Sequence, residues 1–268
     1  MPAERGLAEA LVALQDLTER LRRDCPWDRE QTARTIVPHT VEEAYEVADA
    51  ALAGRPEKLQ DELGDLLFQV YFLALLLAEE GYGDLEDVAR EIHSRLVRRH
   101  PHVFGDAEAD SAGAVRLRWE EIKRTQEGRE GVFHDVPASL PALLHARKVQ
   151  RRVEAAGYDW PDVAGPLAKV REELEELAAE IERAGEPPAQ GEPDARLMDE
   201  VGDVLFTVVN VARRLNVDPE LALRHTTQKF VGRVERAAEL AAERGQMWTE
   251  LELDDQERYY EQAKEAAG

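Results

Sequence analysis

The sequence predicts an all-α protein made of two tandem copies of one helical module. Ala, Leu, Glu and Arg dominate its 268 residues, and aromatic residues make up only 6%. Val and Ile rarely alternate with polar residues, which favours helix over strand almost throughout. In addition, DELGDLLFQV at 61–70 matches DEVGDVLFTV at 199–208 with only conservative or modest changes. This match indicates an internal duplication.

The helices of the first half follow from apolar spacing and from start and stop signals. Leucines three or four residues apart predict the first helix, Gly54 is the expected C-cap of the second, and Asp84 caps the fourth. The third is apolar nearly all round beyond Gly64, so we expect it to be the buried central helix of a bundle. In chain order the expected helices cover residues 7–24, which stops at the segment CPWD, then 38–52, 57–80 and 85–99, with a short one near 119–126.

The second half repeats this plan in the same order. VEEAYEV at 41–47 corresponds to REELEEL at 171–177, and CPWD at 25–28 corresponds loosely to YDWPD at 158–162. The connector before the repeated DE-GD segment is longer in the second half, where 185–191 is expected to be an inserted loop. We therefore expect modules at 1–128 and 137–268, with a linker at 129–136.

Composition and charge exclude several classes of function. The chain has 34 Lys and Arg against 56 Asp and Glu, a net charge of -22, which argues against stable nucleic-acid binding. No apolar run approaches the roughly 20 residues needed to cross a bilayer, so no membrane association is expected. A single cysteine, Cys25, and the lack of a secretory segment at the N-terminus fit a cytoplasmic protein. A polyanionic small substrate would then need local cations, for which a carboxylate-bound divalent metal is the simplest source.

Two sets of carboxylates have the spacing of such a metal site. Residues three or four apart share a helix face, so the acids of each EExxE motif lie together, as do those of each ExxD motif. An acidic helix face is usually only solvated, and an ExxD pair can be an exposed first turn favoured by the helix dipole. Its recurrence before an apolar run, where unpaired carboxylates are costly, favours a site. The two sets are Glu43, Glu46, Glu62 and Asp65, and Glu173, Glu176, Glu200 and Asp203.

The residue types indicate which ion would bind. Carboxylates with no Cys or His at liganding spacing select a hard ion, Mg²⁺ with Mn²⁺ as a substitute, before Zn²⁺. A di-iron site is disfavoured because it would need Glu-x-x-His. We interpret His39 as a surface or capping residue. No GxxxxGK loop and no Ser/His/Asp arrangement is present, which leaves P-loop and acyl-transfer mechanisms without support.

With CPWD at 25–28 and RRHPHVFGD at 98–106, the order EExxE, connector and ExxD resembles the MazG family of all-α nucleoside triphosphate pyrophosphohydrolases. The resemblance spans almost the whole chain in its tandem form. It implies that an NTP or dNTP is hydrolysed to the monophosphate and pyrophosphate, and that the eight carboxylates named above hold Mg²⁺. It also implies a homodimer, which we expect independently because the apolar helix of each module needs more cover than four short helices provide.

The remaining roles fall on acids, cations and one aromatic residue. Glu42 and Glu172, which lead the two EExxE motifs, are candidates to orient or deprotonate the attacking water, although either acid can simply be solvated. Metals alone do not cover the phosphate charge, so Arg or Lys should assist, although such cations can equally be helix-surface residues paired with Glu. Tyr260 resembles the family's base-stacking position. The residues expected to bind substrate are Lys58, Arg95, Arg99, Lys169, Arg196, Lys229, Arg233 and Tyr260.

Two other functions stay open at this point. One is a nucleotide sensor or scaffold with vestigial turnover in one or both modules. The other is a related all-α dUTPase or phosphoribosyl-ATP pyrophosphohydrolase, which would share the metal chemistry and differ in the substrate pocket. The main hypothesis includes a role in clearing noncanonical or excess nucleotides, with base and sugar preference left open.

Overall fold

The computed structural model describes all residues except 1, 108–110, 112, 114, 116, 117, 120, 123–130, 135, 186–193 and 268. All regular secondary structure in that part of the chain is helical, which confirms the predicted class. The chain divides into two compact units, Met1–Ile122 and Lys123–Gly268. The predicted module end at 128, most of the short helix near 119–126 and nearly all of the loop at 185–191 lie outside the described residues.

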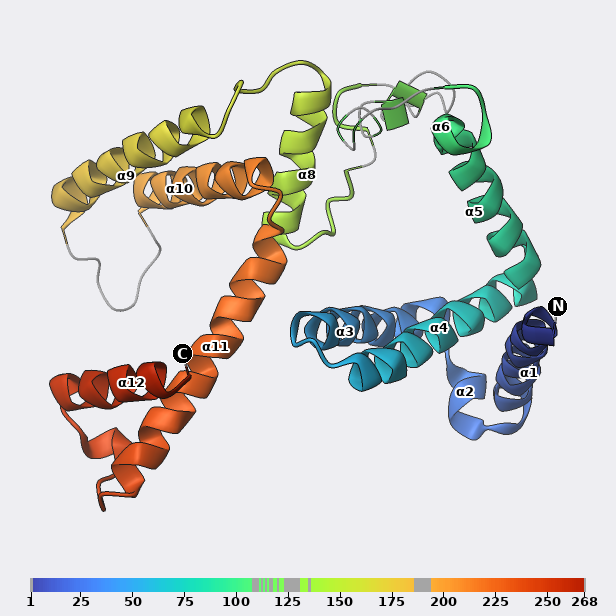
Figure 1. Ribbon diagram of the computed structural model, residues 1–268, viewed down its shortest axis with the longest axis horizontal. Coiled ribbons are helices and arrows are strands. Elements are labelled where there is room, and N and C mark those ends of the chain that lie inside the picture. Colours follow the sequence, from blue (N-terminus) through green and yellow to red (C-terminus); the bar gives the residue numbers. More distant parts are fainter. Residues whose placement is uncertain are drawn as a thin grey trace. The chain divides into compact units, whose positions relative to one another are not determined.

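The first unit is built around a hairpin of two long helices. Its helices are α1 (Pro2–Asp24), α2 (Pro26–Glu30), α3 (Ala33–Leu52), α4 (Pro56–Glu79), α5 (Leu85–Arg99) and α6 (Pro101–Phe104). α3 lies along α4, and α1 and α5 also contact α4 (Figure 1). Ile36, Phe72 and Leu76 form the buried core of this unit, so the hairpin is held together by apolar contact at a distance from its acidic residues.

Two predicted helix starts in this unit were wrong, since α1 begins at Pro2 and not near Leu7. α3 begins at Ala33 and not near Pro38, because Thr32 caps it: the Thr35 amide donates to Thr32 Oγ1 (3.3 Å), and the Thr32 amide donates to Thr35 Oγ1 (2.8 Å). Pro38 therefore lies inside the helix, where it has no amide to donate to the carbonyl oxygen of the preceding turn. The first helix ends at Asp24, before CPWD, as predicted, and Pro26 occupies the first turn of a further short helix, α2.

The second unit contains a matching hairpin and a second, separate one. Its helices are α8 (Ala142–Ala155), α9 (Ala164–Ala184), α10 (Ala195–Arg214), α11 (Pro219–Ala242), the 3₁₀ helix η1 (Trp248–Glu250) and α12 (Leu253–Ala267). α9 lies along α10, and α12 folds back along α11 (Figure 1). Ala237, Ala241, Tyr259 and Ala263 are buried between α11 and α12, so this unit has its core away from the α9–α10 hairpin.

The central apolar helices are not buried on all sides, contrary to the prediction. α4 buries Phe72 and Leu76 but leaves Leu63 and Leu67 exposed, and α10 leaves Leu205 exposed in the same way. The reason is that within each unit only a few helices contact this element, and they cover one side of it. None of the helices in the described ranges is both long and apolar enough to span a bilayer.

Candidate metal centres

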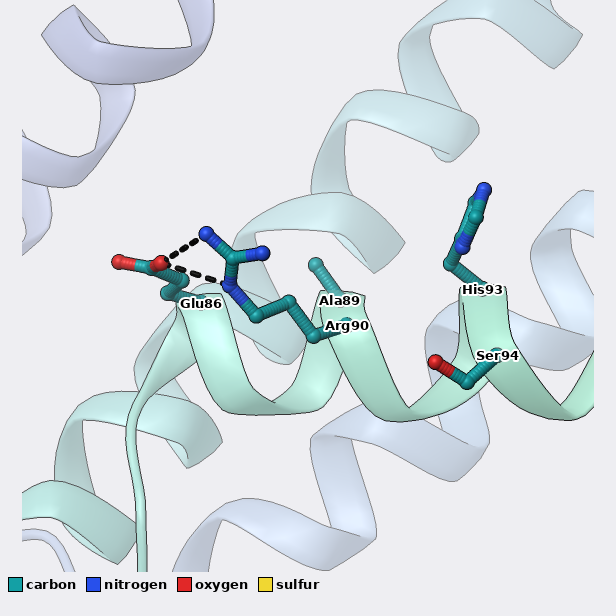
Figure 2. Close-up of a pocket in the computed structure, with 5 residues that line it drawn as sticks. All are labelled: Glu86, Ala89, Arg90, His93 and Ser94. Atoms are coloured by element: carbon teal, nitrogen blue, oxygen red, sulfur yellow. Dashed lines mark hydrogen bonds and ion pairs between the residues drawn. The ribbon is translucent and has the colours of Figure 1, made fainter.

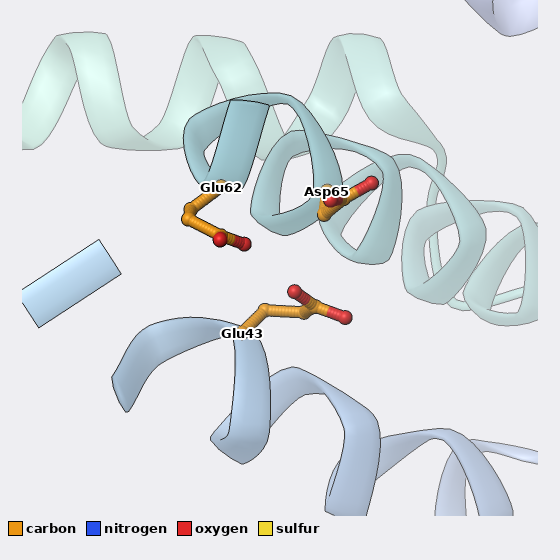
Figure 3. A group of neighbouring side chains, drawn as sticks. All are labelled: Glu43, Glu62 and Asp65. Atoms are coloured by element: carbon orange, nitrogen blue, oxygen red, sulfur yellow. The ribbon is translucent and has the colours of Figure 1, made fainter. Parts of the chain in front are cut away.

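The α3–α4 hairpin brings three predicted carboxylates together. Glu43 points from α3 toward Glu62 and Asp65 on α4 (Figure 3). One carboxylate oxygen from each of the three lies within 4.8 Å of the others. Glu62 is only 4% exposed, whereas Asp65 is at the surface. Three oxygens this close around a partly buried acid form a pocket of negative charge on one side of the hairpin.

The fourth predicted acid of this set, Glu46, lies beside Glu62 and outside the close triad. A hydrogen bond shared with Glu62 raises the pKa of Glu46, and the charge of Glu62 adds to this effect. Burial raises the pKa of Glu43, with further contributions from Asp65 and Glu62. Repulsion from neighbouring carboxylates therefore contributes to both pKa increases, and a cation placed among these acids would relieve it.

The α9–α10 hairpin repeats this arrangement in the second unit. Oxygens of Glu173, Glu200 and Asp203 lie within 4.8 Å of one another, with Glu173 buried and Asp203 exposed. A hydrogen bond with Glu173 raises the pKa of Glu176, so this fourth acid again lies next to the buried member of the set. Glu200 Oε2 is buried and has no hydrogen-bond partner. An orphaned buried carboxylate oxygen in an all-oxygen donor set fits a hard divalent ion.

Each cluster contains a lysine salt-bridged to its buried glutamate. Lys58 pairs with Glu62 one turn along α4, and this contact lowers the pKa of Glu62. Lys169 Nζ lies 2.7 Å from Glu173 Oε1 and 2.8 Å from Glu172 Oε1, and these contacts raise the pKa of Lys169. Both lysines were predicted to bind substrate, and the structure places both at a carboxylate cluster.

Three further predicted residues lie at the edges of the clusters. Glu42 is exposed, with its Oε2 3.9 Å from His39 Nδ1, and Glu172 is exposed apart from its contact with Lys169. His39, which we had interpreted as a surface or capping residue, stands three residues before Glu42, as Lys169 stands three before Glu172. Arg196 is directed to Glu180 of α9 at 4.0 Å, outside the triad.

The other expected cations of the second module gather on a different hairpin. Lys229 is exposed on α11, and the Tyr260 ring on α12 lies 5.7 Å from that of Phe230, the next residue after Lys229. Arg233 follows one turn later on α11, and its Nε is buried without a hydrogen-bond partner. In Figure 1 α11 runs away from α10 and carries α12 at its far end. Within this unit the structure therefore groups these side chains with one another and not with the α9–α10 carboxylates.

The corresponding cations of the first module lie on α5. Arg99 is buried and its guanidinium lies 5.7 Å from the centre of the Trp119 ring, an arrangement typical of packing. Arg95 is half-buried on the same helix. Neither is brought to the α3–α4 carboxylates by a contact that the structure describes, so their assignment as substrate ligands stays a prediction.

A hollow along α5 is a separate feature. It is lined by Glu86, Ala89, Arg90, His93 and Ser94, all from one face of that helix (Figure 2). Its charged groups are already engaged with each other, since Arg90 Nε donates to Glu86 Oε1 at 2.7 Å. A surface formed by a single helix offers no converging groups for catalysis.

Sequence reasoning missed the arginines that fix the segment before each carboxylate helix. Arg22 of α1 forms a bidentate pair with Glu79 of α4, with both N–O distances 2.8 Å. In the second unit Arg213 of α10 bonds Glu154 at 2.7 Å and Asp159 at 2.5 Å. A basic residue in the last turn of each helix was visible in the sequence, but its acidic partner lies more than fifty residues away, and periodicity says nothing about such a pair.

Comparison with known proteins agrees with this geometry. The model of the MazG nucleotide pyrophosphohydrolase domain matches residues 31–104 and 165–237, which include both clusters. The chain is 41% identical to the nucleoside triphosphate pyrophosphohydrolase of Escherichia coli K12 over 94% of this chain and 95% of that one. It is 39% identical to the nucleoside triphosphate pyrophosphohydrolase/pyrophosphatase MazG of Thermotoga maritima over 96% of each. The Mycobacterium tuberculosis nucleoside triphosphate pyrophosphohydrolase is 36% identical over 58% of this chain and 47% of its own length. The chain therefore belongs to the MazG nucleotide pyrophosphohydrolase family, of which it carries two domains in tandem.

Proposed function

We propose that this protein hydrolyses nucleoside triphosphates to the monophosphate and pyrophosphate, with Mg²⁺ or Mn²⁺ held by the two carboxylate clusters. The observation that carries the proposal is the repeated oxygen triad, Glu43, Glu62 and Asp65 and its counterpart in the second unit. Relatives that match almost the whole chain are named for this reaction. Glu46 and Glu176, each bonded to the buried acid of its cluster, would complete the two ligand sets.

The side chains around the clusters have distinct parts in this reaction. When bound, the metal neutralises triphosphate charge and lowers the pKa of a coordinated water. Glu42 and Glu172 are exposed at the edge of each cluster, and we assign to them the proton of the attacking water. The water oxygen forms a bond to the α-phosphorus. At the same time the bond between the α-phosphorus and the oxygen that bridges it to the β-phosphorus breaks, which releases pyrophosphate. We assign Lys58 and Lys169, each paired with the buried glutamate of its cluster, to contact a phosphate oxygen of the substrate.

We also propose that the protein is a homodimer. Leu63, Leu67 and Val70 on α4 are 50%, 39% and 40% exposed, and their spacing places them on one stripe. The same three positions of α10, which hold Val201, Leu205 and Val208, are 45%, 51% and 46% exposed. A repeated apolar stripe on the two central helices is what a second copy would cover. A cytoplasmic location and a role in clearing unwanted nucleotides complete the proposal.

Product analysis tests the reaction. We would incubate the protein with each NTP and dNTP and Mg²⁺ and separate the products by ion exchange, comparing Glu62→Gln and Glu200→Gln. Loss of one ligand should lower the turnover of that module about 100-fold or more. Asp61→Asn and Asp199→Asn, the exposed neighbours of the two glutamates, are matched controls that should keep activity. Diphosphate with orthophosphate would contradict attack at the α-phosphorus, and binding without turnover would favour a sensor.

Sedimentation tests the dimer. The double variant Leu67→Glu and Leu205→Glu places two charges on the exposed stripes and should shift the protein to the monomer. Leu253→Glu, at a residue 67% exposed outside both stripes, should leave the mass unchanged. A wild-type protein that sediments as a monomer at micromolar concentration would rule out the proposed assembly.

A further inference from the structure

Each module holds an exposed tryptophan next to its EExxE helix. Trp27 is 53% exposed, and its ring meets that of His39 edge-on, with 6.0 Å between centroids and 66° between planes. Trp160 is 38% exposed and lies so close to Gly165 at the start of α9 that no Cβ would fit there. His39 precedes Glu43 by four residues and Gly165 precedes Glu173 by eight, which is about 6 and 12 Å along the helix axis. Both rings thus lie one or two turns before the carboxylate cluster.

In the first module the backbone on either side of the tryptophan is fixed. Arg22 Nη1 donates to the carbonyl oxygens of Asp28 at 2.6 Å and of Gln31 at 2.9 Å. The Gln31 side chain donates in turn to the carbonyl oxygen of Trp27 at 2.9 Å. The Arg22 guanidinium is itself anchored by Glu79 of α4. The exposed ring is therefore carried by a segment with little freedom to move.

In the second module different residues produce the same result. Arg213 and Arg214 both bond the carboxylate of Asp159, the residue before Trp160, and Arg214 Nη2 donates to the carbonyl oxygen of Pro161, the residue after it, at 3.0 Å. Here the arginines belong to α10, whereas Arg22 belongs to α1. The two copies thus have different tethers, but both hold an exposed indole on a fixed segment one or two helical turns before the acids.

A large aromatic ring normally stabilises a fold by being buried, and two exposed ones on tethered segments beside the carboxylate clusters offer faces on which a planar ligand can stack. We propose that Trp27 and Trp160 stack on the nucleobase of a nucleotide whose phosphates lie at the neighbouring carboxylate cluster. The separation of one or two helical turns between ring and acids matches a nucleoside lying along the start of α3 or α9. The proposal rests on the proposed function for the position of the phosphates. It assigns the base to these two residues, in addition to Tyr260 on the α11–α12 hairpin.

Calorimetry on the full chain tests this assignment with two ligands that differ in the base. The ligands are an α,β-methylene nucleoside triphosphate, in one purine and one pyrimidine form, and inorganic tripolyphosphate, both with Mg²⁺. In the double variant Trp27→Ala and Trp160→Ala, the dissociation constant of the nucleotide should rise about tenfold, and that of tripolyphosphate should stay within about twofold. Trp27→Phe and Trp160→Phe should recover most of the loss, and the single variants show which module contributes.

Two results would overturn the proposal. One is unchanged nucleotide binding in the alanine variants. The other is an equal weakening of both ligands, which would mean that the rings only support the loop; a urea midpoint for each variant detects such damage directly. Failure of the proposed function has a different signature, namely wild-type protein that binds the methylene nucleotide but hydrolyses no triphosphate.

Discussion

The two carboxylate clusters place their lysine on opposite helices of the hairpin. In the first module Lys58 and the buried Glu62 both belong to α4, whereas in the second Lys169 and the buried Glu173 both belong to α9. The acids themselves occupy equivalent positions in the two copies. The duplicated hairpin therefore keeps its acids at equivalent positions and pairs its buried glutamate with a lysine. Either helix can supply that lysine.

Because the lysine lies on a different helix in each module, a different acid is left without a lysine partner in each cluster. Arg196 stands where Lys58 would be, but it is directed to Glu180, so Glu200 Oε2 is buried without a partner. In the first module His39 stands in the place of Lys169, and its Nδ1 lies 3.9 Å from Glu42 Oε2. A divalent ion would therefore relieve Glu200 in one cluster and Glu43 in the other, so the two sites should differ in metal affinity.

The arginine tethers should show the largest difference between the modules. The side chain of Arg213 is 4% exposed and that of Arg22 is 19% exposed. Arg213→Met removes a buried guanidinium from Asn210 and from the partly buried Asp159, and should cost about 3 kcal/mol of unfolding free energy. Arg22→Met removes a more exposed pair and should cost about 1–2 kcal/mol.

Urea unfolding followed by circular dichroism measures both losses. Arg236→Met, at a 43% exposed arginine on α11, is the control and should be nearly neutral. Equal losses for Arg22→Met and Arg213→Met would show that burial does not distinguish the two tethers.

Helical spacing predicted most of what local sequence determines. The helix at 85–99 and its Asp84 cap were correct, and the motif spacing placed Glu43, Glu62 and Asp65 on facing surfaces. Which glutamate is buried, and which helix carries the lysine, could not be predicted, because both depend on how two helices pack. An apolar helix has the same sequence pattern whether its own chain or a second copy covers it, so the pattern of α4 predicted burial without showing which side is open in a single chain.

The lysines offer a smaller test, in which metal and substrate should respond in opposite directions. Removing Lys58 in Lys58→Met frees the carboxylate of Glu62, so Mg²⁺ should bind the first cluster more tightly, by about fivefold at most because Lys58 is half exposed. If Lys58 also contacts phosphate, KM for the nucleotide rises. Lys169→Met should do the same in the second cluster. Magnesium titration and steady-state kinetics on each variant measure the two effects, and tighter binding of both ligands would exclude a phosphate contact.

The smallest expected effect is on the melting temperature, which substitutions at the equivalent residues Glu43 and Glu173 should shift in opposite directions. Burial raises the pKa of Glu43, so its contribution favours folding below that pKa and is lost as pH rises through it; at pH 7 without metal, ionised Glu43 opposes folding. Glu43→Gln should therefore melt about 1–3 °C above wild type in EDTA at pH 7, with the gain vanishing near pH 4. Glu173→Gln breaks the ion pair with Lys169 and should melt lower. Thermal melts across this pH range decide the matter, and a shift of the same sign in both variants would mean that the position of the lysine has no energetic consequence.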